Sequence, residues 1–166
     1  MNYAEIKFPD IADGPGARAS LFVSGCPHHC KGCFNSETWD YSYGQKFDKT
    51  SEKRLLDCLK HPYIQGLSLL GGEPFDIHNE PCLAEFVKKV RADFPEKDIW
   101  CWSGFIFEEL LNTELIYLID ILVDGPFVEA RKSIGLQYRG SSNQRVIKVR
   151  ESLSSGRPVL LKTHDR

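Results

Sequence analysis

Short apolar runs alternate with helical segments along most of this chain, and this order limits the fold more than any other feature. Four runs are apolar and bounded by glycine or polar residues, which is typical of buried strands: residues 17–24, 66–70, 98–102 and 118–123. Three helical segments lie between them: residues 50–60, with Thr50 as the expected N-cap, 81–92 and 107–111. Residues 145–149 are a candidate for one further strand. This order predicts βαβ units and therefore an α/β fold with a mainly parallel sheet.

Chemically distinctive residues follow each of the four apolar runs directly. They are Cys26, Gly71-Gly72-Glu73-Pro74, Ser103-Gly104 and Asp124-Gly125. In parallel α/β sheets, ligands bind where the carboxyl ends of the strands meet at one edge. The sequence therefore predicts that these four segments form a single site.

Three of the six cysteines lie within eight residues, in a C-x3-C-x2-C loop made of Cys26, Cys30 and Cys33. Crowded thiolates bind zinc, copper(I) or iron–sulfur clusters. A structural zinc site needs four ligands, and His28 or His29 would have to supply the fourth from inside the loop. Three thiolates can instead hold three irons of a [4Fe–4S] cluster and leave the fourth iron open for a reaction. The spacing favours the cluster, and zinc remains the alternative.

The Gly71-Gly72-Glu73-Pro74 segment has two interpretations. Two glycines let the backbone approach a ligand closely, and Glu73 could accept a charge-assisted hydrogen bond from an ammonium group. The alternative is an ordinary strand-to-helix turn with an acid near the helix N-terminus. The position after the cysteine-bearing strand favours the binding site.

The bulk properties exclude several classes of protein. A chain of 166 residues fits one domain, which we expect at residues 1–150, followed by a polar basic tail at 151–166. The net charge of -2 gives no overall attraction to nucleic acid or to an anionic membrane. No apolar run reaches the roughly 18 residues of a membrane span, and the N-terminus has no signal pattern. We therefore expect a cytoplasmic protein with free thiols.

Basic residues are concentrated near the end of the chain. Residues 126–166 hold nine lysines and arginines against three acidic residues. This segment is a solvated basic face or a docking surface for an acidic partner. RNA binding ranks third, because no aromatic-interleaved basic stretch accompanies the charge. Arg18, in the first apolar run, is expected either to be solvated or to approach the site.

The motifs together are similar to those of one enzyme superfamily. The cysteine loop followed by Phe34 resembles the radical S-adenosylmethionine (SAM) superfamily, and Gly71-Gly72-Glu73-Pro74 matches its second signature. Residues 13–16, Asp-Gly-Pro-Gly, resemble the activases of glycyl-radical enzymes. Residues 122–127 and 139–145 look like the activating proteins of the anaerobic (class III) ribonucleotide reductases. The similarity covers about residues 1–150.

The resemblance implies a partial (βα) barrel and a division of the site among the motifs. Three irons of one [4Fe–4S] cluster would be held by Cys26, Cys30 and Cys33, with SAM chelating the fourth. SAM would lie against Gly32, Cys33 and Phe34, and its methionine end would be received by Gly71, Gly72 and Glu73. Ser103 and Asp124 are candidates either for SAM contacts or for turn formers.

The resemblance also implies a reaction and partners. A radical SAM oxidoreductase of this kind cleaves SAM reductively and takes a hydrogen atom from a glycine in the large subunit of anaerobic ribonucleoside-triphosphate reductase. A small electron-donor protein such as a flavodoxin would supply the electron. The chain is short, so we expect its protein substrate to complete the enclosure of the site. The alternatives are an activase of another glycyl-radical enzyme, such as pyruvate formate-lyase, and a zinc-stabilised binding module.

Overall fold

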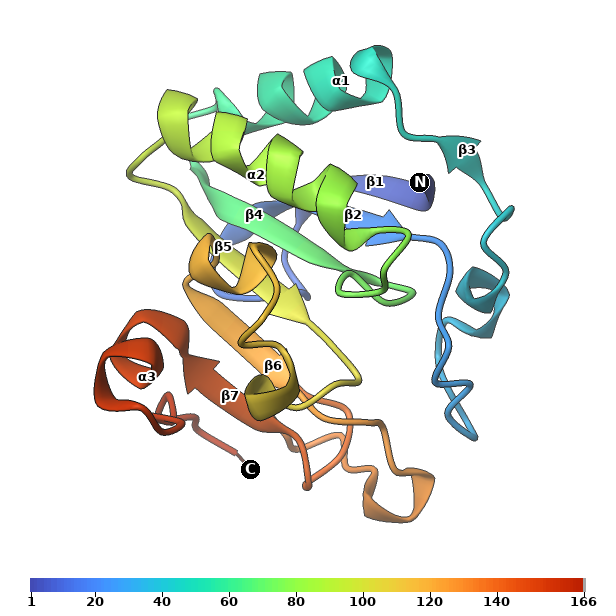
Figure 1. The fold of residues 1–166 in the computed structure, drawn as a ribbon, viewed down its shortest axis with the longest axis vertical. Helices are drawn as coiled ribbons and strands as arrows, with labels where there is room; N and C mark the ends of the chain where they lie inside the picture. The colour runs from blue at the N-terminus through green and yellow to red at the C-terminus, as the bar shows by residue number, and fades with distance from the viewer. Residues whose placement is uncertain (166) are drawn as a thin grey trace.

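The computed structural model describes residues 1–165, and Arg166 lies outside the described residues. Its strands form one seven-stranded sheet with the order β3-β1-β2-β4-β5-β6-β7 (Figure 1). The strands are β1 (Asn2–Asp10), β2 (Ala17–Val23), β3 (Gln45–Lys46), β4 (Ile64–Gly71), β5 (Asp98–Trp102), β6 (Ile121–Asp124) and β7 (Arg145–Lys148). The helices are α1 (Lys49–Leu59), α2 (Glu80–Asp93) and α3 (Val149–Ser155). Single 3-10 turns lie at Ser36–Trp39, Phe107–Glu109, Leu115–Tyr117 and Glu129–Arg131.

The centre of the sheet is parallel, as the sequence predicts. β2, β4, β5 and β6 pair in parallel, in that order. β1, β3 and β7 pair antiparallel with their neighbours on the two sides. Only a short turn joins β1 to β2, and a connection of this length permits antiparallel pairing alone. The α/β class is therefore confirmed, with a mixed sheet that is parallel in its middle.

Two amphipathic helices bury the sheet half that holds β1, β2 and β4 (Figure 1). α1 turns Leu55 and Leu59 inward, and α2 buries Leu83, Phe86 and Val90 at helical spacing. β4 is buried along most of its length on both faces, which accounts for its nearly continuous apolar sequence. The packed half of the molecule thus fixes the positions of β2 and β4, whose carboxyl ends carry two of the motifs.

Several element boundaries differ from the sequence expectation. The N-cap of α1 is Asp48 and not Thr50, because the Asp48 carboxylate accepts hydrogen bonds from the backbone N–H groups of Thr50 and Ser51. The helix expected at 107–111 is a single 3-10 turn. The strand expected at 118–123 begins only at Ile121, because a 3-10 turn occupies Leu115–Tyr117.

The segment after residue 148 packs against the sheet edge. α3 buries Val149 and Ser152, and the following chain runs beside β7, where Lys148 N–H donates to the Val159 carbonyl and Leu161 N–H donates to the Val146 carbonyl. Among residues 1–165, no helix combines the length and the apolar character that crossing a membrane requires.

Arg18 lies in the interior, which neither sequence expectation anticipated. Its side chain is fully buried, and Nε donates to Ser68 Oγ at 2.7 Å. Nη2 donates to the Leu67 carbonyl at 2.9 Å and lies 2.6 Å from Asp98 Oδ1. Ser68 in turn donates to the Asp13 carbonyl at 2.6 Å. Arg18 therefore joins β2, β4 and β5. It also holds the turn at residues 13–16 through Nη1, which donates to the Pro15 carbonyl.

Candidate functional site

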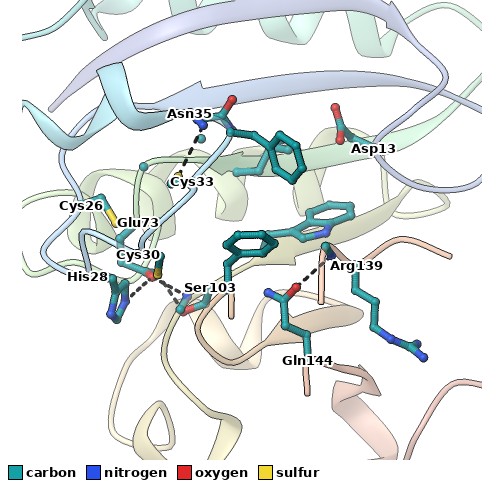
Figure 2. Close-up of a pocket in the computed structure, with 18 of the residues that line it drawn as sticks. Asp13, Cys26, His28, Cys30, Cys33, Asn35, Glu73, Ser103, Arg139 and Gln144 are labelled. Atoms are coloured by element: carbon teal, nitrogen blue, oxygen red, sulfur yellow. Dashed lines mark hydrogen bonds and ion pairs between the residues drawn. The ribbon is translucent and has the colours of Figure 1, made fainter. Parts of the chain in front are cut away.

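The four motif segments border one cavity of about 600 Å³ at the carboxyl ends of the parallel strands (Figure 2). Its lining includes the residues that the sequence singles out after β2, β4 and β5: Cys26, Cys30, Cys33, Phe34, Gly71, Gly72, Glu73, Ser103 and Gly104. After β6, the lining residue is Gly125 and not Asp124. Figure 2 shows Cys26, Cys30, His28, Glu73 and Ser103 gathered in one part of the view, with Asp13 and Arg139 away from them. The structure thus brings segments from four strands together.

The cysteine loop presents its three thiols from one irregular segment after β2. Cys33 N–H donates to the Cys30 carbonyl at 3.1 Å, and Gly32 closes this turn with a φ of +73°. All three cysteines are free and partly exposed to the cavity. Burial raises the pKa of the Cys26 thiol to about 11, so the isolated thiol keeps its proton at neutral pH. A coordinating metal ion would remove that proton.

The chemistry of this donor set fits a cluster in which each thiolate binds its own iron. Neither histidine of the loop is placed to add a fourth ligand: His28 Nε2 lies 2.8 Å from Glu73 Oε2, and the His29 ring stacks on Trp39 with centroids 4.6 Å apart. Among residues 1–165, no three His, Cys, Asp or Glu side chains converge on a position for one metal ion. The other three cysteines lie outside the cavity lining: Cys58 and Cys101 are buried, and Cys82 is partly buried.

Gly71, the last residue of β4, and Gly72 let this turn pack closely against the end of β2 and Gly25. Gly71 has a φ of +105°, and a Cβ atom there would lie 2.8 Å from the backbone of Phe22 and Val23. A Cβ atom on Gly72 would lie 2.5 Å from the Gly25 carbonyl oxygen. The turn docks here through two hydrogen bonds, from Gly72 N–H to the Val23 carbonyl and from Glu73 N–H to the Gly25 carbonyl. The sequence suggested that these glycines let the backbone approach a ligand. In the structure they also let it approach the residues just before the cysteine loop.

Glu73 is fully buried, and its carboxylate is occupied by protein donors. Oε1 accepts from Phe75 N–H at 3.0 Å and from Ser103 Oγ at 2.8 Å. Oε2 accepts from Gly104 N–H at 2.7 Å and pairs with His28 Nε2 at 2.8 Å. The hydrogen bond to Glu73 raises the pKa of His28 above its ordinary value. His28 is therefore part of the site through Glu73, whereas the sequence indicated it only as a possible zinc ligand.

Asp124 and Phe34 occupy different positions relative to the cavity. The buried Asp124 carboxylate accepts from Phe107 N–H at 2.8 Å and pairs with Arg145, so it joins β6 to the 3-10 turn at Phe107–Glu109 and to β7. Phe34 lines the cavity and is 65% exposed. Its ring packs on Phe127, with centroids 5.6 Å apart. Lys132 Nζ also lies over the Phe34 ring, 4.3 Å from its centroid. Asp124 thus supports the wall, while Phe34 is an exposed aromatic residue of the lining that Phe127 and Lys132 contact.

The second wall of the cavity comes from residues 125–144. Gln144 holds this loop closed: its Nε2 donates to the Gly125 carbonyl at 2.9 Å, and its Oε1 accepts from Gly140 and Ser141 N–H. Asn143 Nδ2 donates to the Pro126 carbonyl at 2.8 Å. Both side chains belong to the Gly-Ser-Ser-Asn-Gln stretch at 140–144, within the segment that resembles the activating proteins. Its structural task is to close the loop that contributes Phe127, Leu136, Tyr138 and Arg139 to the cavity.

Comparison with known proteins places this site in a family. Residues 12–147 match a family model described as a 4Fe-4S single cluster domain. The anaerobic ribonucleoside-triphosphate reductase-activating protein of Escherichia coli (strain K12) is 44% identical over 90% of this chain and 100% of its own length. This chain belongs to that family of activating proteins. Proteins of the same name from Vibrio cholerae and from Enterobacteria phage T4 are each 42% identical, over 87% and 88% of this chain and 96% and 93% of their own lengths.

Membership of the activating-protein family resolves the choice between the sequence alternatives. The matched domain is described by a 4Fe-4S cluster and not by zinc, and it covers the cysteine loop and all four strand ends. The relatives named above are reductase activators, so an activase of pyruvate formate-lyase type and a zinc-stabilised module are both set aside. The resemblance to the activating proteins of anaerobic ribonucleotide reductases is thereby confirmed.

Proposed function

We propose that this chain is a radical SAM activase of anaerobic ribonucleoside-triphosphate reductase. Cys26, Cys30 and Cys33 bind three irons of one [4Fe–4S] cluster, and SAM occupies the fourth. When bound, the cluster and SAM supply radical chemistry, the reductive cleavage of SAM and the removal of a hydrogen atom from a glycine of the reductase. The observation that carries the proposal is the position of three free thiols, from one loop, in the same cavity as the ends of the other parallel strands.

The remaining lining residues would bind and orient SAM. A cavity of about 600 Å³ lies within the range of about 300–1,000 Å³ that is usual for small-molecule sites. The exposed ring of Phe34 and the backbone of Cys33 would contact the adenosyl part, with Gly32 beside them in the loop. Lys132 Nζ, over the Phe34 ring, would have to share that ring or move. The methionine end would meet the backbone of Gly71 and Gly72, because the Glu73 carboxylate is already engaged by protein donors. Ser103 would contribute through Glu73.

Within the α/β class, we propose that the fold is a partial (βα) barrel. The parallel order β2-β4-β5-β6, with the site at the carboxyl ends of these strands, supports it. Asp124 would support this arrangement from outside the cavity, through its contacts with Phe107 and Arg145.

The family suggests the reductase as a partner, and exposed side chains near the cavity support this proposal. Three large apolar side chains near or in its lining segments are exposed: Ile11, Phe34 and Ile134. Because exposed apolar side chains beside a cavity suit contact with a protein, we propose that the large subunit of the reductase covers the cavity and brings its glycine there. A small electron-donor protein such as a flavodoxin would reduce the cluster, and the chain would work in the cytoplasm without nucleic acid or membrane.

Electron paramagnetic resonance tests the proposed function. The chain is reconstituted anaerobically with iron and sulfide, reduced with dithionite, and mixed with SAM and the reductase. We expect a glycyl-radical doublet on the reductase, and its loss in the Cys30→Ala variant. Cys58→Ala, which changes a buried cysteine of α1 away from the cavity, should retain the doublet. A doublet of undiminished size with Cys30→Ala, or its absence with the wild-type chain, would refute the proposal.

A further inference from the structure

The Glu73 carboxylate joins three segments that lie far apart in the sequence. Its donors come from its own turn (Phe75), from the end of β5 (Ser103 and Gly104) and from the cysteine loop (His28), as Figure 2 shows in part. An ionised carboxylate accepts about four hydrogen bonds, and all of these positions are filled. His28 is the one member of this set that belongs to the cysteine loop.

The packing around His28 fixes the direction of its ring. The ring meets Phe105 edge-on, with centroids 4.5 Å apart. A Cβ atom on Gly104 would lie 2.4 Å from His28 Cδ2, so only glycine leaves room for the imidazole. An ionised Glu73 only accepts, so His28 donates through Nε2–H. Phe105, Gly104 and Glu73 together hold the His28 ring in one orientation.

The middle of the cysteine loop, residues 27–32, makes few other polar side-chain contacts with the rest of the structure. Between residues 27 and 32, the described structure gives two polar side-chain contacts that leave the loop: His28 with Glu73, and Lys31 with Glu129 at 3.2 Å. The Lys31 side chain is 91% exposed, and such an exposed pair contributes little to stability. His28 thus makes the main polar connection between this part of the loop and the rest of the site.

We infer that His28 is a positioning residue, which holds the cysteine loop against Glu73 and thereby sets where the cluster stands relative to bound SAM. This inference rests on the proposed function. Cys26 and Cys30 flank His28 on either side, while Gly71 and Gly72 precede Glu73 directly. The hydrogen bond therefore couples two iron ligands to the turn assigned to the methionine end. A misplacement of about 1 Å at a reacting centre can lower a rate by about a hundredfold.

Three substitutions separate the hydrogen bond from the space that the ring fills. His28→Phe keeps the aromatic packing and His28→Leu keeps part of the volume, but both lack the N–H donor. His28→Gln restores a donor at similar reach. His29→Asn is the matched control in the same loop, because asparagine tolerates the φ of 45° at that position and His29 has no contact with Glu73.

The measurements are iron content, the SAM dissociation constant, and the change that SAM causes in the electron paramagnetic resonance spectrum of the reduced cluster. We expect His28→Phe and His28→Leu to bind iron at the wild-type level, to bind SAM at least about tenfold more weakly, and to lose most of the spectral change. His28→Gln should recover both properties, and His29→Asn should leave them unchanged.

Several results would overturn the inference. One is wild-type SAM binding and spectra in whichever of His28→Phe and His28→Leu folds. Others are an equal loss in His29→Asn, or no recovery in His28→Gln. A wild-type chain that takes up neither cluster nor SAM would instead refute the proposed function, so the two failures are distinguishable.

Discussion

Replacing Arg18 by methionine tests the interior of the sheet beneath the site. The substitution removes a fully buried cation that pairs with Asp98 and donates to Ser68 and to the Leu67 carbonyl. Methionine fills similar space without a charge. The variant therefore leaves Asp98 without its partner and the buried polar groups of β4 with fewer donors.

The magnitude follows from burial. Removing one partner of a buried ion pair costs about 3–5 kcal/mol. The Asp98 side chain is 31% exposed, so water replaces part of the lost interaction and the lower end, about 3 kcal/mol, applies. For a chain of this length, about 2–4 °C of thermal midpoint is lost per kcal/mol, which gives a decrease of about 6–12 °C.

Urea and thermal unfolding of the metal-free chain under reducing conditions measure this loss. Arg54→Met is the control, because Arg54 is exposed on α1 and forms no ion pair within residues 1–165. Its free energy of unfolding should change by no more than about 0.5 kcal/mol. Equal midpoints for Arg18→Met and Arg54→Met would show that the buried arginine does not stabilise the sheet.

Three further substitutions test the walls of the cavity. Gln144→Ala removes the side-chain hydrogen bonds to Gly125, Gly140 and Ser141, so it should lower the free energy of unfolding by about 2–3 kcal/mol and expose residues 126–143 to protease. Protease resistance equal to that of the wild type would contradict the closed loop. Burial and the neighbouring Asp10 raise the pKa of Asp13 to about 7. The wild type therefore loses stability as the pH rises from about 4 to about 7. The free energy of unfolding of Asp13→Asn in urea, relative to that of the wild type, should increase over the same range. A difference that stays constant with pH would contradict this. Gly72→Ala places a Cβ atom 2.5 Å from the Gly25 carbonyl oxygen. It should lower the free energy of unfolding in urea by about 1–3 kcal/mol and reduce iron uptake. Wild-type values for both would contradict the close contact.

The parallel centre of the sheet was predictable because its strands are apolar and end at glycine or polar residues. β1 was not predicted. Its sequence includes Glu5, Lys7 and Pro9, and two irregularities in its pairing with β2 break the alternation of buried and exposed positions. Such a strand is recognised by its neighbours in the sheet and not by its own periodicity.

The segments of the site were predictable from their positions after the strands, but the use of each side chain was not. The sequence shows an acid after two glycines, yet the donors that fill the Glu73 carboxylate come from His28 and from residues 103 and 104. For Arg18 the sequence allowed either a solvated side chain or one near the site, and the structure instead encloses it between β2, β4 and β5. Both outcomes depend on contacts between distant parts of the chain, which local patterns do not contain.

The most direct test of the account is the product analysis of SAM itself. The reconstituted chain, reduced anaerobically in the absence of any partner, should convert SAM to methionine and 5′-deoxyadenosine, because the proposed set of three cysteine ligands would leave one iron for SAM. Replacement of any one of Cys26, Cys30 and Cys33 by alanine should abolish both products. A wild-type chain that holds its full cluster and forms neither product would contradict the account, as would undiminished products in those variants.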